Sequence, residues 1–336
     1  MTAIRIIAAV AVLSGVCLFL KRLDPHPRHD VIGTSVACTN GFPFAGIHAE
    51  VLEYGLQDVR GLACDASGQD VFIAEGKRSV LVYSTQSGSI VRSRQLLCSG
   101  APCEVTDRRG LAFVEPILYV AEHGRAQIIE RNFESSREAL SSSGDLDPSL
   151  GVSTPLSGTA GMISAPSGVA FAEQTLFITD DPKEDSAEPA GALYACASSN
   201  CEPQLVSDHL EHPSGVAAAS KDGPVYVVEK RAHEVDWPIF TNTSEHGWMR
   251  SGSLGSAPIS ESAAPPFWGI AFNDSRRMIF AAGPGGLYIF GRTGRNSGRV
   301  RFEDPITGIA SCGEVVYFAV GHMLGRLVIP RQLPHE

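Results

Sequence analysis

The segment Pro213-Ser-Gly-Val-Ala-Ala-Ala-Ser-Lys-Asp-Gly-Pro-Val-Tyr-Val-Val-Glu229 contains the pattern that decides the fold. An apolar run of the form x-Gly-(Leu/Ile/Val)-Ala leads, after a short turn, into a second run that is typical of a β-strand. This pattern occurs six times along the chain. The first runs are Arg60-Gly-Leu-Ala, Arg109-Gly-Leu-Ala, Ser167-Gly-Val-Ala, Ser214-Gly-Val-Ala, Trp268-Gly-Ile-Ala and Thr307-Gly-Ile-Ala, and the second runs are Val71–Glu75, Leu118–Glu122, Leu176–Asp180, Val225–Glu229, Met278–Ala282 and Val315–Val320.

A repeat of this kind fixes the architecture, because each unit buries its apolar face only against its neighbours. The pattern predicts an all-β fold, a six-bladed β-propeller. The repeat glycines lie 39 to 58 residues apart, whereas four-stranded blades need about 40 to 50 residues. The longer intervals therefore predict inserted loops, at residues 134–158, 182–189 and 241–266.

The first blade shows the expected strands most clearly. They are Gly61–Cys64, Val71–Ala74, Ser79–Tyr83 and Ile90–Leu97. The last blade shows only three strands, and the third of them ends near Pro330. We expect Ala49–Tyr54 to supply its fourth strand, because this would close the ring and remove the exposed sheet edges.

The first thirty residues differ from the rest of the chain. Residues 6–20 form an almost unbroken apolar run, with Arg5 before it and Lys21 and Arg22 after it. This is typical of a membrane signal-anchor or of a cleaved signal peptide, and both alternatives stay open. Both place the propeller, residues 31–336, outside the cytosol, either membrane-anchored or secreted.

The charge of the chain bears on its partners. The formal net charge is −10, which argues against nucleic acid as a partner, because binding to phosphates requires a basic face. We expect a monomer, and we expect no cofactor. The sequence contains no Gly-x-Ser-x-Gly elbow, phosphate-binding loop or dinucleotide fingerprint.

The cysteines also favour an oxidising compartment. Cys98 and Cys103 have the same spacing as Cys196 and Cys201, and four small intervening residues allow each pair to close a local disulfide. Cys64 and Cys312 lie near the starts of the first and last blades, so two pairings stay open, one between these two cysteines and one between either of them and Cys38. Two sequons, at Asn242 and Asn273, are candidate glycosylation sites in a eukaryotic host.

The motif Pro-Ser-Gly-Val-Ala followed by Val-Tyr-Val-Val-Glu resembles NHL repeats. More broadly, it is similar to the six-bladed group that includes the SMP-30/gluconolactonase, paraoxonase and strictosidine-synthase families. In the lactonase-like families, the residue before the inner-strand glycine points into the central channel, and several such residues are carboxylates or amides that bind calcium. In this chain that register holds Arg60, Arg109, Ser167, Ser214, Trp268 and Thr307.

Arginines repel a divalent cation, so the resemblance implies that the calcium site of the lactonases is missing here. The same six residues could instead hold a small anion or an acidic peptide at the rim of the channel. The alternative is that the two arginines only pair with nearby acids such as Asp58 and Asp107.

Two further groups of residues could bear on function. Glu75, Glu122, Asp180 and Glu229 each end the second strand of a repeat. Such recurrence predicts a structural role, in which the carboxylate accepts N–H groups of a turn. The histidines at positions 123, 209, 212, 233, 246 and 322 are expected to lie in loops without a ligand.

The sequence therefore predicts an extracytoplasmic or lumenal binding module that recognises a protein or a small acidic ligand. The alternative is an enzyme, a hydrolase or lyase related to the SMP-30 and strictosidine-synthase families, that uses the central channel.

Overall fold

The computed structural model describes residues 31–36, 48–65, 67–75, 79–95, 97–98, 101–102, 108–123, 127–132, 152–156, 159, 161–182, 191–197, 201–229, 237–254, 269–283, 286–291, 298–302 and 304–329. The chain divides into two compact units, Met1–Asp30 and Val31–Glu336. The first unit, with its predicted anchor or signal peptide, lies outside the described residues. Within the described ranges, no helix is long and apolar enough to cross a membrane.

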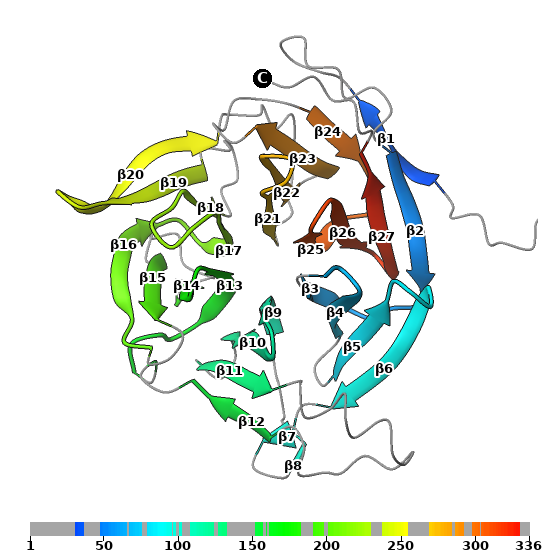
Figure 1. Cartoon of the computed structure of the whole chain (residues 1–336), viewed down its shortest axis with the longest axis horizontal. Helices are drawn as coiled ribbons and strands as arrows, with labels where there is room; N and C mark the ends of the chain where they lie inside the picture. The colour runs from blue at the N-terminus through cyan, green and yellow to red at the C-terminus, as the bar shows by residue number, and fades with distance from the viewer. Residues whose placement is uncertain are drawn as a thin grey trace, which may run out of the picture. The chain divides into compact units, whose positions relative to one another are not determined.

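The second unit is built of sheets, antiparallel except for one short pairing, that are arranged around a common axis (Figure 1). Blade one contains β3 (Val59–Cys64), β4 (Asp70–Glu75), β5 (Ser79–Ser84) and β6 (Ser89–Gln95). Blade two contains β9 (Arg108–Val114), β10 (Ile117–Glu122), β11 (Gln127–Asn132) and β12 (Val152–Pro155). Blade three contains β13 (Pro166–Ala172), β14 (Thr175–Asp180), β15 (Gly191–Ala197) and β16 (Gln204–Leu210).

The remaining three blades follow the same plan. Blade four contains β17 (Pro213–Ala218), β18 (Val225–Glu229), β19 (Trp237–Thr243) and β20 (Gly247–Leu254). Blade five contains β21 (Ile270–Asn273), β22 (Met278–Gly283), β23 (Gly286–Gly291) and β24 (Gly298–Arg301). Blade six contains β25 (Ile306–Cys312), β26 (Val315–Val320) and β27 (Met323–Val328), and it is completed by β2 (His48–Tyr54). The predicted six-bladed propeller is confirmed.

The N-terminal part of the second unit closes the ring. Strand β2 pairs antiparallel with β27, with His48 opposite Val328 and Tyr54 opposite Met323. This confirms the predicted closing strand. A further strand that the sequence did not predict, β1 (Val31–Val36), pairs with both β2 and β24. It joins blades five and six into one nine-stranded sheet.

The glycine in each repeat is explained by the close approach of neighbouring inner strands. A Cβ added at Gly168 would lie 2.7 Å from Oγ1 of Thr179 and 2.9 Å from Cα of Gly215. One added at Gly110 would lie 2.7 Å from the backbone nitrogen of Val169. Such distances are too short for a side-chain carbon, so the inner strands need glycine where they converge on the axis.

The hydrophobic core lies between adjacent blades. Phe72 and Val80 of blade one pack with Leu111 and Leu118 of blade two. On the other side of blade one, a second cluster joins it to blade six through buried residues such as Tyr317. Each blade therefore buries both of its faces, as the repeat pattern predicts.

Two disulfides connect described residues. Cys64 on β3 is bonded to Cys312 on β25, across the boundary between blades one and six. This resolves the open alternatives for Cys64 and Cys312 in favour of the ring-closing pair. Cys196 is bonded to Cys201, as predicted.

The other predicted disulfide is only partly within the described residues. Cys98 ends β7 (Leu97–Cys98), which forms a short hairpin with β8 (Ala101–Pro102). Its expected partner Cys103 lies outside the described residues, as does Cys38. The predicted bond between Cys98 and Cys103 therefore stays a prediction.

Two of the predicted inserts contain outer strands. Strand β12 lies within residues 134–158, and β20 lies within residues 241–266. The interpretation of these whole stretches as loops was wrong. Most residues of β20 are exposed, so the strand does not show the alternation of apolar residues that reveals a half-buried strand. Strand β20 lies at the outer edge of the blade, and this is why the apolar pattern of the sequence does not predict it.

Candidate functional site

The end of the channel at which the inner strands begin is the candidate functional site, and we call it the channel entrance. We define it by the residues that precede the six repeat glycines and by the loops beside them. Of those six residues, Arg60, Ser167, Ser214 and Thr307 are described in full. Arg109 lies in β9, but its side chain is outside the described part, and so is the whole of Trp268.

Arg60 is paired with an acid of its own loop. Its Nε lies 2.9 Å from Oδ1 of Asp58, and about a third of the arginine side chain (34%) is exposed. This confirms the predicted pairing with Asp58. The corresponding pairing of Arg109 with Asp107 lies outside the described residues. Because the ion pair is largely solvated, it stabilises the fold only slightly and leaves Arg60 at the surface of the entrance.

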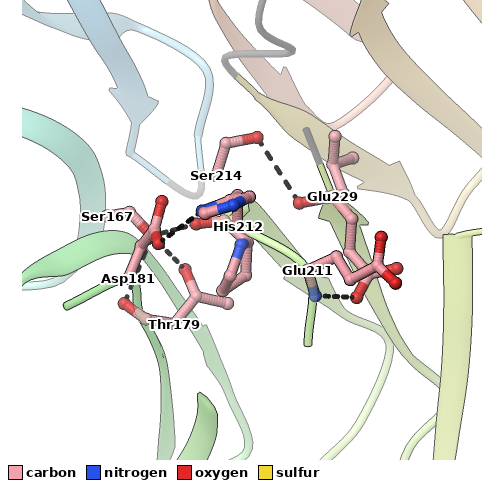
Figure 2. Close-up of polar contacts among 9 residues, drawn as sticks. Ser167, Thr179, Asp181, Glu211, His212, Ser214 and Glu229 are labelled. Atoms are coloured by element: carbon pink, nitrogen blue, oxygen red, sulfur yellow. Dashed lines mark hydrogen bonds and ion pairs between the residues drawn. The ribbon is translucent and has the colours of Figure 1, made fainter. Parts of the chain in front are cut away.

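The hydroxyls of the two serines are both engaged by backbone carbonyls, that of Ser167 by the next blade and that of Ser214 by its own blade (Figure 2). The hydroxyl of Ser167 donates to the carbonyl of Pro213 in the next blade and lies 3.1 Å from Oγ1 of Thr179. The hydroxyl of Ser214 donates to the carbonyl of Val228 at 3.4 Å. Both serines are buried. A ligand at the entrance would therefore have to compete with these bonds for their hydroxyls.

Thr307 differs from the serines. Its Oγ1 is buried and has no hydrogen-bond partner among the residues that the structure describes. A buried hydroxyl without a partner is unfavourable by about 1–3 kcal/mol. Of the predicted rim residues described in full, Thr307 is thus the one whose polar atom is not already engaged.

The recurring acids support the loops that lead into the inner strands. Asp180 accepts hydrogen bonds from the backbone N–H groups of Ser164 and Ala165. In the same way, Glu75 accepts from the N–H of Gln57 at 2.7 Å, and Glu229 accepts from the N–H of Glu211 at 2.6 Å. The predicted structural role is confirmed for these three acids. The carboxylate of Asp180 also acts on Tyr194, whose pKa is raised first by burial and then by that nearby charge.

A histidine and a buried aspartate form a second polar contact between blades (Figure 2). Nδ1 of His212 lies 3.1 Å from Oδ1 of Asp181, whose side chain is 1% exposed. Asp181 follows β14 in blade three, whereas His212 lies in the loop that leads into β17 of blade four. The histidine side chain is 17% exposed, so solvent reaches the imidazole but not the carboxylate.

The local backbone presents His212 in a fixed orientation. The φ angle of His212 is +51°, a left-handed conformation that non-glycine residues adopt at a cost of about 1–3 kcal/mol. The carboxylate of Asp181 can only accept, so the proton of a neutral imidazole belongs on Nδ1. Nε2 is then a hydrogen-bond acceptor. Within the described residues, Nε2 makes no hydrogen bond.

The sequence pattern does not reveal this pair. From the sequence, His212 is expected to be a loop histidine without a ligand, and Asp181 does not stand out. The missing information was the contact between two blades, which depends on how residues 31 positions apart are brought together. The position of His212 in the repeat gives a partial indication that it belongs to the entrance. His212 and Asp58 both stand three positions before a repeat glycine, and both have a positive φ angle.

Behind the entrance, the channel narrows at the ring of glycines. The cavity there has a volume of about 40 Å³ and is lined by backbone of all six inner strands and by Ser214. Such a space holds one or two water molecules. A ligand bound at the entrance therefore stays on that side of the ring. The channel widens again at its other end, to a cavity of about 170 Å³.

No group of three or more His, Cys, Asp or Glu side chains is placed to hold a metal ion within the described ranges. The expectation that the domain binds no metal stays a prediction, because part of the chain lies outside those ranges.

The two sequons lie in different environments. Asn242 in β19 is partly exposed, and its Nδ2 lies 3.5 Å from a carboxylate oxygen of Asp222. The side chain of Asn273 is buried, and it donates to the carbonyl of Gly313 at 2.8 Å. In the folded domain a glycan can therefore be carried at Asn242, whereas at Asn273 it would displace a buried contact.

Comparison with solved structures gives many propellers. A gluconolactonase from Xanthomonas campestris has a TM-score of 0.62 and 16% identity, over 91% of this chain and 99% of that one. A calcium-binding regucalcin from Agrobacterium tumefaciens has a TM-score of 0.57 and 15% identity, over 86% of this chain and 95% of that one. A chain of a nidogen–laminin complex has a TM-score of 0.54 and 13% identity, over 75% of this chain and 85% of that one.

No family model matches the sequence, and no curated protein matches it significantly. The structural comparisons confirm the resemblance to the propeller group of the gluconolactonases and regucalcins. At these identities the likeness establishes the fold, which enzymes and binding proteins share.

Proposed function

We propose that this protein is an extracytoplasmic or lumenal NHL-like propeller that acts as a binding module. Its channel entrance would receive a small acidic ligand or an acidic segment of another protein. The observation that carries the proposal is the pair of His212 and Asp181 on one side of the entrance, with Arg60 also at the entrance. A guanidinium group and a protonated imidazole, in which both ring nitrogens donate, are suited to bind carboxylates and phosphates.

The water-sized cavity behind the entrance supports this proposal. A ligand would be held at the surface by polar groups and by the loops around them, rather than buried in a deep pocket. The protein would act as a monomer, attached to a membrane through residues 1–30 or secreted. The net charge of −10 continues to disfavour nucleic acid as a partner.

A metal-independent hydrolase is the second candidate function, and the same pair of residues favours it. A histidine whose Nδ1 is held by a buried carboxylate is the arrangement that general-base catalysis uses. Nε2 of His212 would take a proton from a water molecule as that water attacks a lactone carbonyl. The proton would then pass to the alkoxide oxygen that leaves when the ring C–O bond breaks. The likeness to a gluconolactonase suggests the lactone.

Ligand binding should be tested first, on the purified full-length chain. Thermal unfolding would be followed with phosphate, gluconate and a glutamate-rich peptide as probes. We expect at least one probe to raise the melting temperature, and we expect Arg60→Gln and His212→Asn to weaken that effect at least fivefold. Lys221→Gln, in an exposed turn between β17 and β18, is the matched control. If the control weakens binding as much as the two variants do, the entrance is not the site.

Hydrolysis of glucono-δ-lactone in the presence of EDTA separates the two candidates. Turnover that persists in EDTA and disappears in His212→Asn would establish the hydrolase. Binding without turnover would establish the binding module. One tightly held ion per chain after dialysis, together with turnover that EDTA abolishes, would contradict the metal-independent mechanism.

A further inference from the structure

The other end of the channel, which we call the far mouth, has a different chemistry from the entrance. Its cavity of about 170 Å³ is lined by the residues that follow the repeat glycines by one, two and three positions. All of the lining residues are uncharged, and most are Leu, Ile, Val, Ala or Phe. A charged ligand would lose hydration there without gaining a side chain of opposite charge. The far mouth therefore favours a neutral occupant.

Three phenylalanines stand at one register of the repeat, three positions after the glycine. Phe113, Phe171 and Phe272 come from blades two, three and five; all three line the cavity and are partly exposed. The corresponding positions of blades one, four and six hold the smaller Cys64, Ala218 and Ser311. The wall therefore combines aromatic rings from three blades with small side chains from the other three, which leaves open space next to aromatic surface.

Each of the three rings is supported from behind by another aromatic residue. The ring centroids of Phe113 and Phe72 lie 4.5 Å apart. Those of Phe171 and Tyr119 lie 6.4 Å apart, and those of Phe272 and Tyr226 lie 5.8 Å apart. The supporting residues, Phe72, Tyr119 and Tyr226, are buried. We therefore infer that the three phenylalanine rings are ordered before a ligand binds. Preorganisation of this kind lowers the entropic cost of binding.

The wall also offers hydrogen bonds. Each inner strand pairs with only one neighbour within its own blade, as β13 does with β14. Its other edge faces the channel with unpaired backbone N–H and C=O groups, which need water or a ligand as a partner. Ser311 adds a hydroxyl to the same wall. An occupant with one hydrogen-bonding group would satisfy part of this requirement.

We propose that the far mouth is a second ligand site, which takes a neutral aromatic ring that carries a single hydrogen-bonding group. The volume of the mouth is sufficient for one ring, since a cavity of about 150 Å³ holds one benzene molecule. This site differs from the entrance in its location and in the charge of its ligand. It does not depend on the function proposed for the entrance, because the glycine ring separates the two.

The test uses benzyl alcohol and benzoate, which share a ring and differ in charge. Each would be titrated into the full-length chain, with the dissociation constant measured by ligand-detected NMR. We expect benzyl alcohol to bind with a dissociation constant on the order of 1 mM, as a ligand of this size allows. Benzoate should bind at least tenfold more weakly. Equal affinity for the two compounds, or no binding of benzyl alcohol at 20-fold that concentration (about 20 mM), would overturn the proposal.

Variants that fill the cavity locate the site. Ala218→Leu places a larger side chain in the wall from blade four, and we expect it to weaken benzyl alcohol binding at least tenfold. Ala197→Leu, at an exposed position at the end of β15, is the matched control and should leave binding unchanged. Undiminished binding to a folded Ala218→Leu chain would contradict the proposal.

If Ala218→Leu does not fold, Ser311→Leu fills the cavity from blade six in the same way. Fluorine NMR on wild-type chain labelled with fluorophenylalanine gives a further readout. The resonances of Phe113, Phe171 and Phe272, assigned through Phe→Leu variants, should shift with benzyl alcohol more than those of other phenylalanines. Shifts confined to other phenylalanines would place the ligand elsewhere and overturn the proposal.

Discussion

The two ends of the channel are built from the same six strands, yet they differ in what their side chains do. At the entrance, polar side chains bind one another, as Arg60 does with Asp58 and His212 with Asp181. At the far mouth, the lining is uncharged and includes three phenylalanine rings. Each inner strand is only a few residues long. The lining therefore changes from polar to uncharged between the residue before the repeat glycine and the third residue after it.

The difference follows from where each position lies in the repeat. Residues before the glycine lie at the start of the inner strands and in the loops that lead into them, where backbone carbonyls, turn geometry and water accept polar groups. Residues after it pack between the blades and line the far mouth, where burial selects apolar side chains. A propeller can therefore vary its entrance without disturbing its core, which is why one fold serves many functions.

The largest effect on stability is expected for substitutions in the glycine ring, which separates the two ends of the channel. Gly168→Val would place side-chain atoms within 3 Å of Thr179 and of the backbone of Gly215. We expect a loss of at least about 4 kcal/mol in the free energy of unfolding, or failure to fold, because the neighbouring backbone cannot move away. Denaturant unfolding followed by circular dichroism would measure the loss.

A glycine outside the ring provides the control. A Cβ at Gly252 would meet its nearest neighbour, Ile239, at 3.9 Å, which is ordinary contact. We therefore expect Gly252→Ala to change the free energy of unfolding by less than about 1 kcal/mol. If both substitutions are equally tolerated, close strand approach does not explain the glycines.

The next largest effect concerns the disulfide beside the far mouth. Cys64 and Cys312 are 248 positions apart, whereas Cys196 and Cys201 are five apart. Loop-closure entropy predicts that losing the first bond costs about 5 kcal/mol and losing the second about 2 kcal/mol. Paired Cys→Ser variants, compared by denaturant unfolding, would measure this difference. A larger cost for the local pair would show that native strain, rather than chain entropy, dominates.

A smaller effect is expected for the polar pair at the entrance. A double-mutant cycle on His212→Asn and Asp181→Asn should give a coupling energy of about 1–2 kcal/mol, because the carboxylate is buried. His209 and Asp208, 3.3 Å apart but 92% and 60% exposed, form the matched control. Their coupling should be close to zero. If the coupling energy between His212 and Asp181 were also close to zero, the two residues would not act together.

The smallest effect on stability is expected at high pH, and it concerns Tyr317 at the boundary between blades one and six. Burial raises the pKa of Tyr317 above its ordinary value; Arg326 opposes that shift and Asp65 adds to it. A raised pKa in the folded state means that the stabilisation is complete below pH 10 and is lost as the pH rises through the folded value. Tyr317→Phe should therefore reduce the alkaline loss of stability.

Thermal unfolding between pH 8 and pH 11 would test this prediction. Tyr54→Phe, in which an exposed tyrosine is replaced, should leave the alkaline profile unchanged. An identical profile for wild type and Tyr317→Phe would show that this tyrosine does not control the loss.

The fold could be predicted from the sequence because each blade repeats the same apolar pattern. The six inner strands, their partners and the closing strand β2 all follow from that pattern. Strands β1 and β20 could not be predicted in this way. Strand β20 is largely exposed, and β1 is positioned by its pairing with two strands that are distant in sequence.

The candidate site could be predicted less well. The register predicted which residues stand at the entrance, and it predicted that the recurring acids support turns. It could not show that Ser167 and Ser214 are engaged by backbone carbonyls of their own or a neighbouring blade. Nor could it reveal the contact between His212 and Asp181, since a contact between blades depends on three-dimensional packing rather than on sequence period.

The pairing of β2 with β27 also determines how this domain would respond to mechanical force. His48 begins β2 and lies opposite Val328, which ends β27, so the chain leaves the blade at one end of the pair in both directions. A pull on both ends of the chain would first act on β1, which pairs with β2 and β24, and after its release would peel β2 away one residue pair at a time instead of shearing all pairs together. The bond between Cys64 and Cys312 would still connect blades one and six, so the inner ring could survive the loss of its closing strand.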